Sequence, residues 1–356
     1  MRTLAERAQI EGTPIIDGNT ATLVWRGQQA PRLAGDFNDW DWDKPVALQQ
    51  IAPGVWAYTL ELPRDAYIEY AYMLGDKRVA DPLNPRSTPD GVGSHNHFFY
   101  MPDAAATPLA WRRRDVPHGS VTRHTIRTDG LAASSRRSVH LYQPPTTEPC
   151  PLVVVFDGRD YLHRAGLTVI VDNLLAEGRI RPIALAMVDN GGRARTVEYA
   201  CSESTVGLVL YPVLSLARAH LNLSDVEAQP GAYGVLGASL GGLISLYTAL
   251  RAPHIFGRVL SQSGAFGWGV ADSVVFDLIR DGGHQPIKIW MDIGQFEGLL
   301  AANRRMHALL MDRGYDVTYR EYHAGHNYPA WRDDVWRGLE ALFGTHTVAS
   351  DQIANH

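Results

Sequence analysis

The feature that most constrains this chain is a strand–turn–helix pattern around Ser239. Residues 234–242 read Gly-Val-Leu-Gly-Ala-Ser-Leu-Gly-Gly, and the helix-like run 243–250 follows them. Gly237, Ser239 and Gly241 therefore form the pattern G-x-S-x-G in the context that this pattern requires. A nucleophilic serine needs a sharp turn, the glycines let strand and helix approach closely, and the helix N-terminus stabilises developing negative charge. The pattern predicts an ester or amide hydrolase.

The composition sets broad limits on the class of protein. The chain has 356 residues, of which 45% are hydrophobic and 20% are charged, and its net charge is −5. These values are typical of a soluble globular protein with more than one domain, and they give no sign of nucleic-acid binding. Two cysteines, Cys150 and Cys201, are too few for a disulfide framework, so we expect buried free thiols.

The chain shows neither a signal peptide nor a membrane span. Its first ten residues lack the apolar segment of a secretory signal. No run of about 18 apolar residues is present. We therefore expect a cytoplasmic location, with neither a membrane nor a nucleic acid as partner.

The sequence divides into two regions with different patterns. Short β-like segments separated by turns predict a small immunoglobulin-like β-sandwich over residues 1–103. A linker is expected at 104–117. Strands that alternate with helices predict a mostly parallel sheet with helices on both faces over 118–346, before a tail at 347–356. Together with the G-x-S-x-G pattern, this favours an α/β-hydrolase domain.

The expected strands of the first region are 22–26, 32–35, 55–62, 68–74 and 97–100. The expected strands of the second are 137–142, 151–156, 183–188, 232–236, 287–291 and 317–321. The expected helices are 166–178, 204–221, 239–252, 299–313 and 329–343.

A serine hydroxyl needs a general base, which hydrolases of this kind take from a histidine late in the chain. His326 is the preferred candidate, because it lies between the last strand-like segment and the final helix-like one. His323 is the second choice, and we expect it to end the strand. The non-catalytic interpretation of His326 is an ordinary surface-loop histidine.

The acid of the triad should follow the strand that ends near Gly294. Glu297 is the preferred candidate, since a carboxylate there would hold the imidazole tautomer and stabilise the imidazolium. Asp292 is the alternative, although we expect it to lie within the strand. A solvated charge near a helix N-terminus is the non-catalytic interpretation of Glu297.

The oxyanion needs two N–H donors. One is expected from Leu240, the residue after the nucleophile. The other is expected from Gly158 or Arg159, directly after the apolar strand 151–156. A plain turn is the alternative reading of this loop.

Further residues are expected to bind the substrate at the rim of the site: Asp157, Arg195, Glu198 and Trp331. Arg195 would bind a substrate carboxylate or phenolate. The alternative is that Arg195 and Glu198 pair with each other, three residues apart, and order their loop.

Together these segments resemble the esterase D and enterochelin-esterase group of α/β-hydrolases over about residues 118–345. The segments that carry the resemblance are Phe156-Asp157-Gly158, Arg195 with Glu198, residues 237–242, residues 260–264, Gly294 with Glu297, and Gly325-His326-Asn327 with Trp331. The resemblance implies Ser239 as nucleophile, His326 as base and Glu297 as acid. It also implies an N-terminal β-sandwich and no metal or other cofactor.

The first region is similar to family-48 carbohydrate-binding modules. The similarity rests on Ala34-Gly35-Asp36-Phe37-Asn38-Asp39-Trp40 and on the later segments Gly54-Val55-Trp56 and Tyr70-Ala71-Tyr72. The resemblance implies sugar stacking on tryptophan. The alternative is that these aromatic residues fill a small core.

The sequence therefore predicts a serine carboxylic-ester hydrolase that acts through an acyl-enzyme on a small aromatic or catecholate ester. A feruloyl or acetyl esterase acting on acylated carbohydrate is the alternative. A carbohydrate-binding protein with an inactive hydrolase domain, and an acyltransferase, are further hypotheses. Carbohydrate and a ferric siderophore are candidate ligands, and a homo-oligomer is a candidate assembly.

Overall fold

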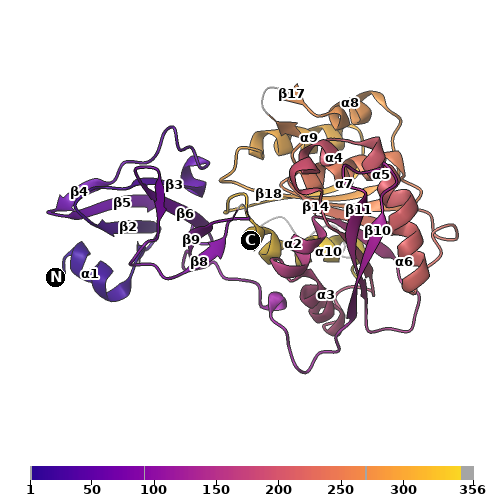
Figure 1. Cartoon of the computed structure of the whole chain (residues 1–356), viewed down its shortest axis with the longest axis horizontal. Helices are drawn as coiled ribbons and strands as arrows, with labels where there is room; N and C mark the ends of the chain where they lie inside the picture. Colours follow the sequence, from indigo (N-terminus) through magenta and orange to yellow (C-terminus); the bar gives the residue numbers. More distant parts are fainter. Residues whose placement is uncertain (1, 92, 269–270, 346–356) are drawn as a thin grey trace. The chain divides into compact units, whose positions relative to one another are not determined.

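The computed structural model describes residues 2–91, 93–268 and 271–345, so the expected tail lies outside the described residues (Figure 1). Contacts between residues divide the chain into two compact units. Unit 1 comprises Met1–Ala106, Gly294–Leu300 and Glu321–Ala330. Unit 2 comprises Thr107–Ile293, Ala301–Arg320 and Trp331–His356. The domain boundaries expected from the sequence stay predictions.

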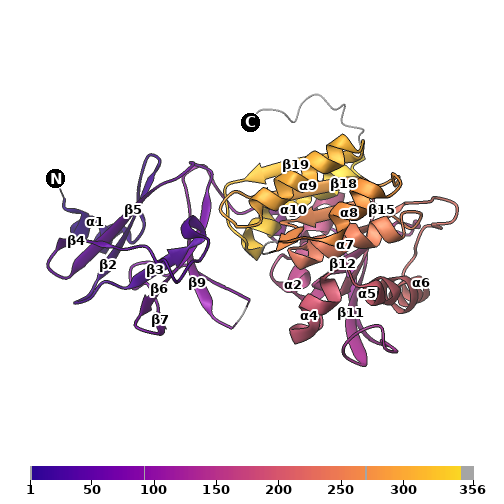
Figure 2. The ribbon, with the colours of Figure 1, turned by 90° about the horizontal axis from the view of Figure 1, so that it is seen from above.

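Unit 1 contains two antiparallel sheets, drawn in indigo and violet in Figure 2, with the strand orders β1-β2-β5-β4 and β3-β6-β9-β8, and β7 also pairs with β6. The strands of the first sheet are β1 (Ile15–Asp17), β2 (Thr20–Arg26), β4 (Gln49–Ala52) and β5 (Val55–Glu61). Those of the second are β3 (Arg32–Gly35), β6 (Tyr67–Leu74), β7 (Lys77–Val79), β8 (Ser87–Pro89) and β9 (His95–Tyr100). The short helix α1 (Leu4–Glu11) precedes them.

Large apolar side chains fill the core of this β region. Leu23, Leu33, Tyr70, Tyr72 and Phe99 are fully buried in one cluster. The neighbouring strand β5 largely alternates buried and less buried positions, because successive side chains point to opposite faces of a sheet.

Two tryptophans of the first region, Trp25 and Trp56, pack against its core. Trp25 is 7% exposed, and its Nε1 donates a hydrogen bond to the carbonyl of Gln29. Half-buried Trp56 packs against the same cluster and donates to the carbonyl of Gly27. These contacts favour the core-filling alternative, and carbohydrate binding stays a prediction.

Unit 2 is built on an eight-stranded sheet in the order β10-β11-β13-β12-β14-β15-β18-β19. The strands β13, β12, β14, β15 and β18 run parallel, and β10 and β11 pair antiparallel at one edge. The strands are β10 (Ser120–Arg127), β11 (Arg136–Gln143), β12 (Leu152–Phe156), β13 (Ala184–Val188), β14 (Tyr233–Ala238), β15 (Phe256–Gln262), β18 (Lys288–Gly294) and β19 (Asp316–Tyr322). A separate hairpin pairs β16 (Gly267–Trp268) with β17 (Ala271–Asp272).

Helices cover both faces of the sheet. In Figure 1, α3 and α10 lie below the sheet, and α4, α7, α8 and α9 lie above it. The helices are α2 (Gly158–His163), α3 (Leu167–Ala176), α4 (Arg195–Tyr199), α5 (Glu203–Leu208), α6 (Leu214–His220), α7 (Leu240–Arg251), α8 (Val274–Asp281), α9 (Leu300–Asp312) and α10 (Tyr328–Phe343). Every residue of β12, β13 and β14 is buried, as expected for parallel strands covered on both sides. The expected α/β fold with a mostly parallel sheet is therefore confirmed.

The expected strands and long helices are present, with ends that differ by a few residues. One helix differs in its interior. The helix expected at 204–221 consists of α5, a π-helical turn at Val209–Val213 and α6. Pro212 lies inside that turn and cannot donate a backbone hydrogen bond, which interrupts the α-helical pattern.

Among the described residues, no single helix is long and apolar enough to cross a membrane. The helical segments 192–199 and 203–220 meet that test only when they are joined across a bend of 104°.

We expect Leu33→Ala to lower the free energy of unfolding by about 2–5 kcal/mol, because it leaves a cavity in the core of the β region. Urea unfolding followed by tryptophan fluorescence would measure the change. Ile51→Ala is the matched control, since Ile51 is 45% exposed, and should change this free energy by about 0.5 kcal/mol or less. Equal effects of the two variants would contradict the assignment of this core.

Candidate active site

Ser239 stands on a strained turn between β14 and α7. Its φ of 60° and ψ of −124° lie in a region that non-glycine residues rarely occupy, at a cost of about 1–3 kcal/mol. Its N–H donates to the carbonyl of Gln262 over 2.9 Å, and its own carbonyl accepts from the N–H of Ala265 over 3.0 Å. The turn after β15 thus holds the backbone on both sides of the half-buried serine.

The flanking glycines are required by close packing. A Cβ on Gly237 would overlap the backbone of Gly241, and a Cβ on Gly242 would lie 2.5 Å from the hydroxyl of Ser261. Leu240 is the first residue of α7, so its N–H belongs to the helix end that has no intrahelical acceptor. The local geometry is the sharp turn between strand and helix that the sequence pattern predicts, and the role of Ser239 as nucleophile stays a prediction.

The loop after β12 places Asp157 and Gly158 in the same unit as Ser239. Asp157 has φ 54°, is 2% exposed and directly precedes α2, which begins at Gly158. A Cβ on Gly158 would overlap the backbone of Met187 and Val188, so only glycine fits there. The side chain of Arg159 is exposed.

Arg195 is paired with Asp157. Its Nε and Nη2 each donate to one carboxylate oxygen over 2.7 Å, a bidentate arrangement, and Asn190 adds a third bond of 2.7 Å. Arg195 Nη2 also lies 3.4 Å from the carbonyl of Ala238, the residue before the candidate nucleophile. The guanidinium keeps 27% side-chain exposure.

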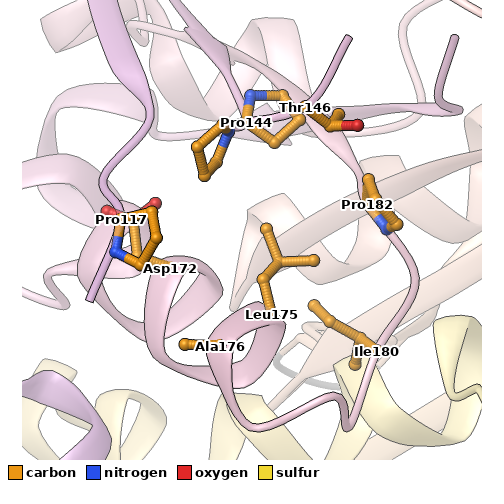
Figure 3. A pocket seen from close by; sticks show the side chains of 9 residues that line it. Pro117, Pro144, Thr146, Asp172, Leu175, Ala176, Ile180 and Pro182 are labelled. Atoms are coloured by element: carbon orange, nitrogen blue, oxygen red, sulfur yellow. The ribbon is translucent and has the colours of Figure 1, made fainter. Parts of the chain in front are cut away.

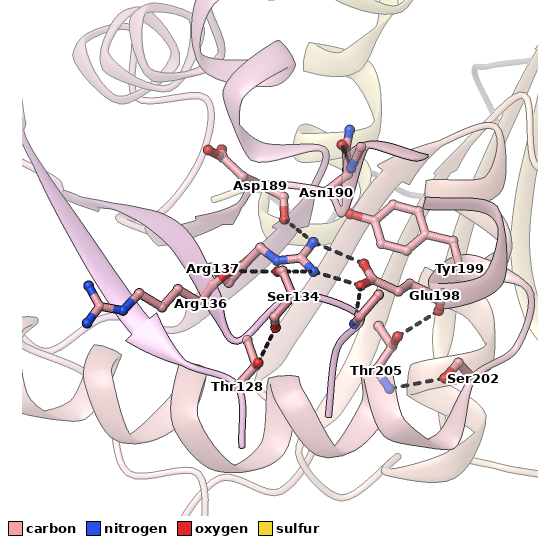
Figure 4. A network of polar contacts seen from close by, with 12 residues as sticks. Thr128, Ser134, Arg136, Arg137, Asp189, Asn190, Glu198, Tyr199, Ser202 and Thr205 are labelled. Carbon is pink, nitrogen blue, oxygen red and sulfur yellow. Dashed lines mark hydrogen bonds and ion pairs between the residues drawn. The ribbon is translucent and has the colours of Figure 1, made fainter. Parts of the chain in front are cut away.

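Glu198 is paired with Arg137 of β11, not with Arg195 (Figure 4). Arg137 Nη1 and Nη2 donate to the two carboxylate oxygens over 3.0 and 2.7 Å, and Nη1 also donates to the carbonyl of Asp189. The N–H of Ala133 adds a bond of 2.9 Å to Glu198. The alternative that Arg195 and Glu198 pair with each other is therefore wrong, because the buried Glu198 side chain meets two donors of Arg137.

Glu297 and His326 are brought together in unit 1. The Nδ1 of His326 lies 2.5 Å from one carboxylate oxygen of Glu297, whose other oxygen accepts the N–H of Gly294 over 2.9 Å. Glu297 is 6% exposed, whereas the His326 side chain keeps 33% exposure. A carboxylate can only accept, so Nδ1 carries the proton and Nε2 is the basic nitrogen.

The two alternative candidates have other partners. Asp292 lies inside β18, as expected, and accepts hydrogen bonds from Trp290 Nε1 and Gln262 Nε2. Burial and then the charge of Asp334 raise its pKa well above the usual range. His323 directly follows β19 and its Nδ1 lies 2.6 Å from Asp65.

Trp331 belongs to a buried network behind the serine. Its Nε1 donates to Ser263 Oγ over 2.9 Å, and Trp331 is 4% exposed. The Gln262 side chain joins Tyr161, Asp292 and the carbonyl of Trp331. Sequence analysis assigned no role to Gln262, although the segment 260–264 carried part of the resemblance. Arg137 and Asn190 were also missed, because their partners lie 61 and 33 residues away.

A cavity of about 300 Å³ lies elsewhere in unit 2 and is lined by none of the candidate site residues (Figure 3). Prolines 117, 144, 145 and 182 contribute much of its wall, together with Asp172. The Asp172 carboxylate is bound by His118, by the N–H of Gly119 and by the hydroxyl of Tyr142. These bonds join α3, which carries Asp172, to β11 and to the segment that precedes β10. The role of Asp172 is therefore structural.

Arg137→Met should lower the free energy of unfolding by about 3–5 kcal/mol, because it leaves the Glu198 carboxylate buried without its cation. Adding Glu198→Gln to that variant should recover part of the loss, since the uncompensated charge is removed. Arg136→Met is the control at an exposed neighbouring arginine and should change the value by about 0.5 kcal/mol or less. Chemical denaturation would measure all three variants, and a loss in Arg137→Met no larger than in the control would refute the role of the pair.

The fold and these local geometries agree with comparisons to known proteins. The model of the Esterase family, described as "Putative esterase", matches residues 132–342. An iron(III) enterobactin esterase of Dickeya dadantii is 28% identical over 322 residues, which cover 84% of this chain and 72% of that protein. An iron(III) enterobactin esterase of Escherichia coli K12 is 27% identical over 74% of this chain and 67% of that protein.

A crystal structure of ferric enterobactin esterase from Salmonella typhimurium has a TM-score of 0.81 at 23% identity and covers 96% of this chain and 98% of that one. This likeness concerns the fold and extends over both units. Since the family model covers more than half of the sequence, the chain belongs to the Esterase family and is an ester hydrolase.

Proposed function

We propose that the protein hydrolyses catecholate siderophore esters by a serine mechanism, with Ser239 as nucleophile, His326 as general base and Glu297 as the acid. The observation that carries the proposal is the hydrogen bond from His326 Nδ1 to the buried Glu297 carboxylate. The strained Ser239 precedes both residues in the sequence. Serine, acid and histidine follow in the order used by α/β-hydrolases. Ser239 follows β14 and Glu297 follows β18, and both strands belong to the parallel part of one sheet.

The chemistry requires two steps. In the first, Ser239 Oγ attacks the ester carbonyl while His326 Nε2 takes its proton and passes it to the departing alkoxide. Glu297 holds the tautomer and stabilises the imidazolium. In the second step, His326 deprotonates a water molecule, which attacks the acyl-enzyme and releases the acid and free Ser239.

Backbone donors would stabilise both tetrahedral intermediates. We assign this role to the N–H of Leu240 and the N–H of Gly158 or Arg159, each at the start of a helix. The close packing of Gly158 against the backbone after β13 supports a fixed loop. Asp157 would act by orienting Arg195.

The relatives support a catecholate substrate. The two curated relatives described above are iron(III) enterobactin esterases, and an enterobactin esterase of Shigella flexneri was crystallised in the presence of 2,3-dihydroxy-N-benzoyl-serine. The partly exposed Arg195 guanidinium lies beside the residue that precedes Ser239, where it would attract an anionic catecholate or its ferric complex. A neutral feruloyl or acetyl ester would not use this charge, which favours the catecholate over that alternative.

Ser239→Ala should lower kcat for a catecholate triester and for p-nitrophenyl butyrate by at least about 10³-fold, because no other group replaces the nucleophile. Steady-state hydrolysis would measure it, and methyl ferulate would test the alternative substrate. Ser202→Ala is the control, since the Ser202 hydroxyl only caps α5. An unchanged kcat in Ser239→Ala would refute the serine mechanism.

Arg195 should discriminate between charged and neutral esters. Its removal alone would leave Asp157 buried without a cation, so the variant is Asp157→Asn combined with Arg195→Gln. We expect KM for the ferric catecholate ester to rise about tenfold and KM for p-nitrophenyl butyrate to change about twofold or less. Equal changes for both substrates would exclude a specific role for the charge, and Asp157→Asn alone is the control.

A further inference from the structure

The segment Gly35-Asp36-Phe37-Asn38-Asp39-Trp40 has no part in the mechanism above, yet it forms a tightly bonded turn in unit 1. The N–H of Gly35 donates to Asn38 Oδ1, and the N–H of Trp40 donates to the carbonyl of Gly35. Asp39 and Trp40 both have positive φ, of 53° and 57°. The turn therefore presents the carboxyl groups of Asp36 and Asp39 in fixed positions.

Asp39 contacts the segment that carries the acid. Its Oδ1 accepts the N–H of Gly298, the residue after Glu297, over 3.1 Å. A Cβ on Gly298 would lie 2.6 Å from Asp39 Oδ2, so the glycine allows this approach. On the other side of the acid, Phe296 packs against the core of the β region.

Asp36 contacts the segment that carries the base. A Cβ on Gly325, the residue before His326, would overlap the carboxyl group of Asp36. Asp36 is 2% exposed, and its two oxygens accept the N–H of Glu69 and the Nε1 of Trp40. Burial first, and then the negative charges of Glu69 and Glu297, raise the pKa of Asp36.

Further bonds join the same two segments to β6 and to each other. The N–H of Tyr67 donates to the carbonyl of His323 over 2.9 Å. The N–H groups of Gln295 and Phe296 donate to the carbonyls of Tyr322 and Ala324 over 2.8 and 3.1 Å. The acid and base segments are thus part of the same hydrogen-bonded unit as the N-terminal β region.

We propose that Asp36 and Asp39 are positioning residues that hold Glu297 and His326 in their hydrogen-bonded geometry, so that the N-terminal β region serves the chemical step. This inference rests on the proposed function. In this proposal the segment 35–40, which resembles part of a carbohydrate-binding module, supports catalysis and need not contact a sugar.

The test compares Asp39→Ala, which removes the acceptor for Gly298, with Asp39→Asn, which retains an acceptor and tolerates the positive φ. We expect Asp39→Ala to lower kcat for p-nitrophenyl butyrate about tenfold with KM changed about twofold or less, the loss typical of one oriented hydrogen bond. Asp39→Asn should restore kcat to within about threefold of the wild type. Asp76→Ala, at a fully exposed carboxylate of the same β region, is the control and should leave kcat unchanged.

A second pair of variants separates positioning from misfolding. Gly298→Ala should lower kcat in the wild-type background, where the new methyl group meets Asp39, and should have a smaller effect when Asp39→Gly removes that carboxyl. Near-ultraviolet circular dichroism would confirm that each variant is folded. Additive effects, a failure of Asp39→Asn to restore kcat, or a full kcat in Asp39→Ala would each overturn the proposal.

Failure of the proposed serine mechanism would give a different experimental result from failure of the positioning role. It appears as activity retained by Ser239→Ala in the unaltered Asp39 background. Loss of activity in Ser239→Ala together with full activity in Asp39→Ala would overturn the positioning role alone.

Discussion

The strained, positive-φ backbone of Ser239 is the constraint around which the neighbouring elements of unit 2 are arranged, because a strained conformation persists only where its surroundings hold it. The turn at Gln262–Ala265 supplies that hold by accepting from the Ser239 N–H and donating to its carbonyl. This turn is itself strained at Ser263, which has φ 46°. Trp331 donates to the hydroxyl of Ser263, and the N–H of Ser263 donates to the carbonyl of Asp292. Strain at the serine is thus supported through β15, β18 and α10.

Paired charges fix the loops around this turn. Asp157 and Glu198 are both buried, and each takes two donors from one arginine. Breaking such a pair leaves a buried charge without its partner, so each pair holds its loops in one arrangement. The two arginines differ in exposure, since Arg137 is 4% exposed and the Arg195 side chain is 27% exposed. Arg137 is suited to structure, whereas Arg195 retains a surface that a ligand can meet.

The order of strands and long helices could be predicted because buried parallel strands are continuous apolar runs and the helices have their own periodicity. The strands β1, β4, β7 and β8 have only three or four residues each and carry no such signal. The partners of the candidate residues were also beyond sequence analysis. Glu198 meets Arg137 from 61 residues earlier in the chain, and only the fold places Gly325 against Asp36. The direction of the Trp331 side chain, toward Ser263, likewise depends on packing.

The N-terminal β region shows why a motif does not by itself identify a ligand. Trp25 and Trp56 direct their N–H groups to backbone carbonyls, and their rings belong to the core cluster of the β region. The turn that begins at Gly35 is held by its own hydrogen bonds, so its conformation needs no bound sugar. The role of such a turn depends on which segment of the chain its side chains contact. In this chain that segment contains Gly298 and Gly325, next to Glu297 and His326, so under the proposed mechanism the motif would hold the acid and the base.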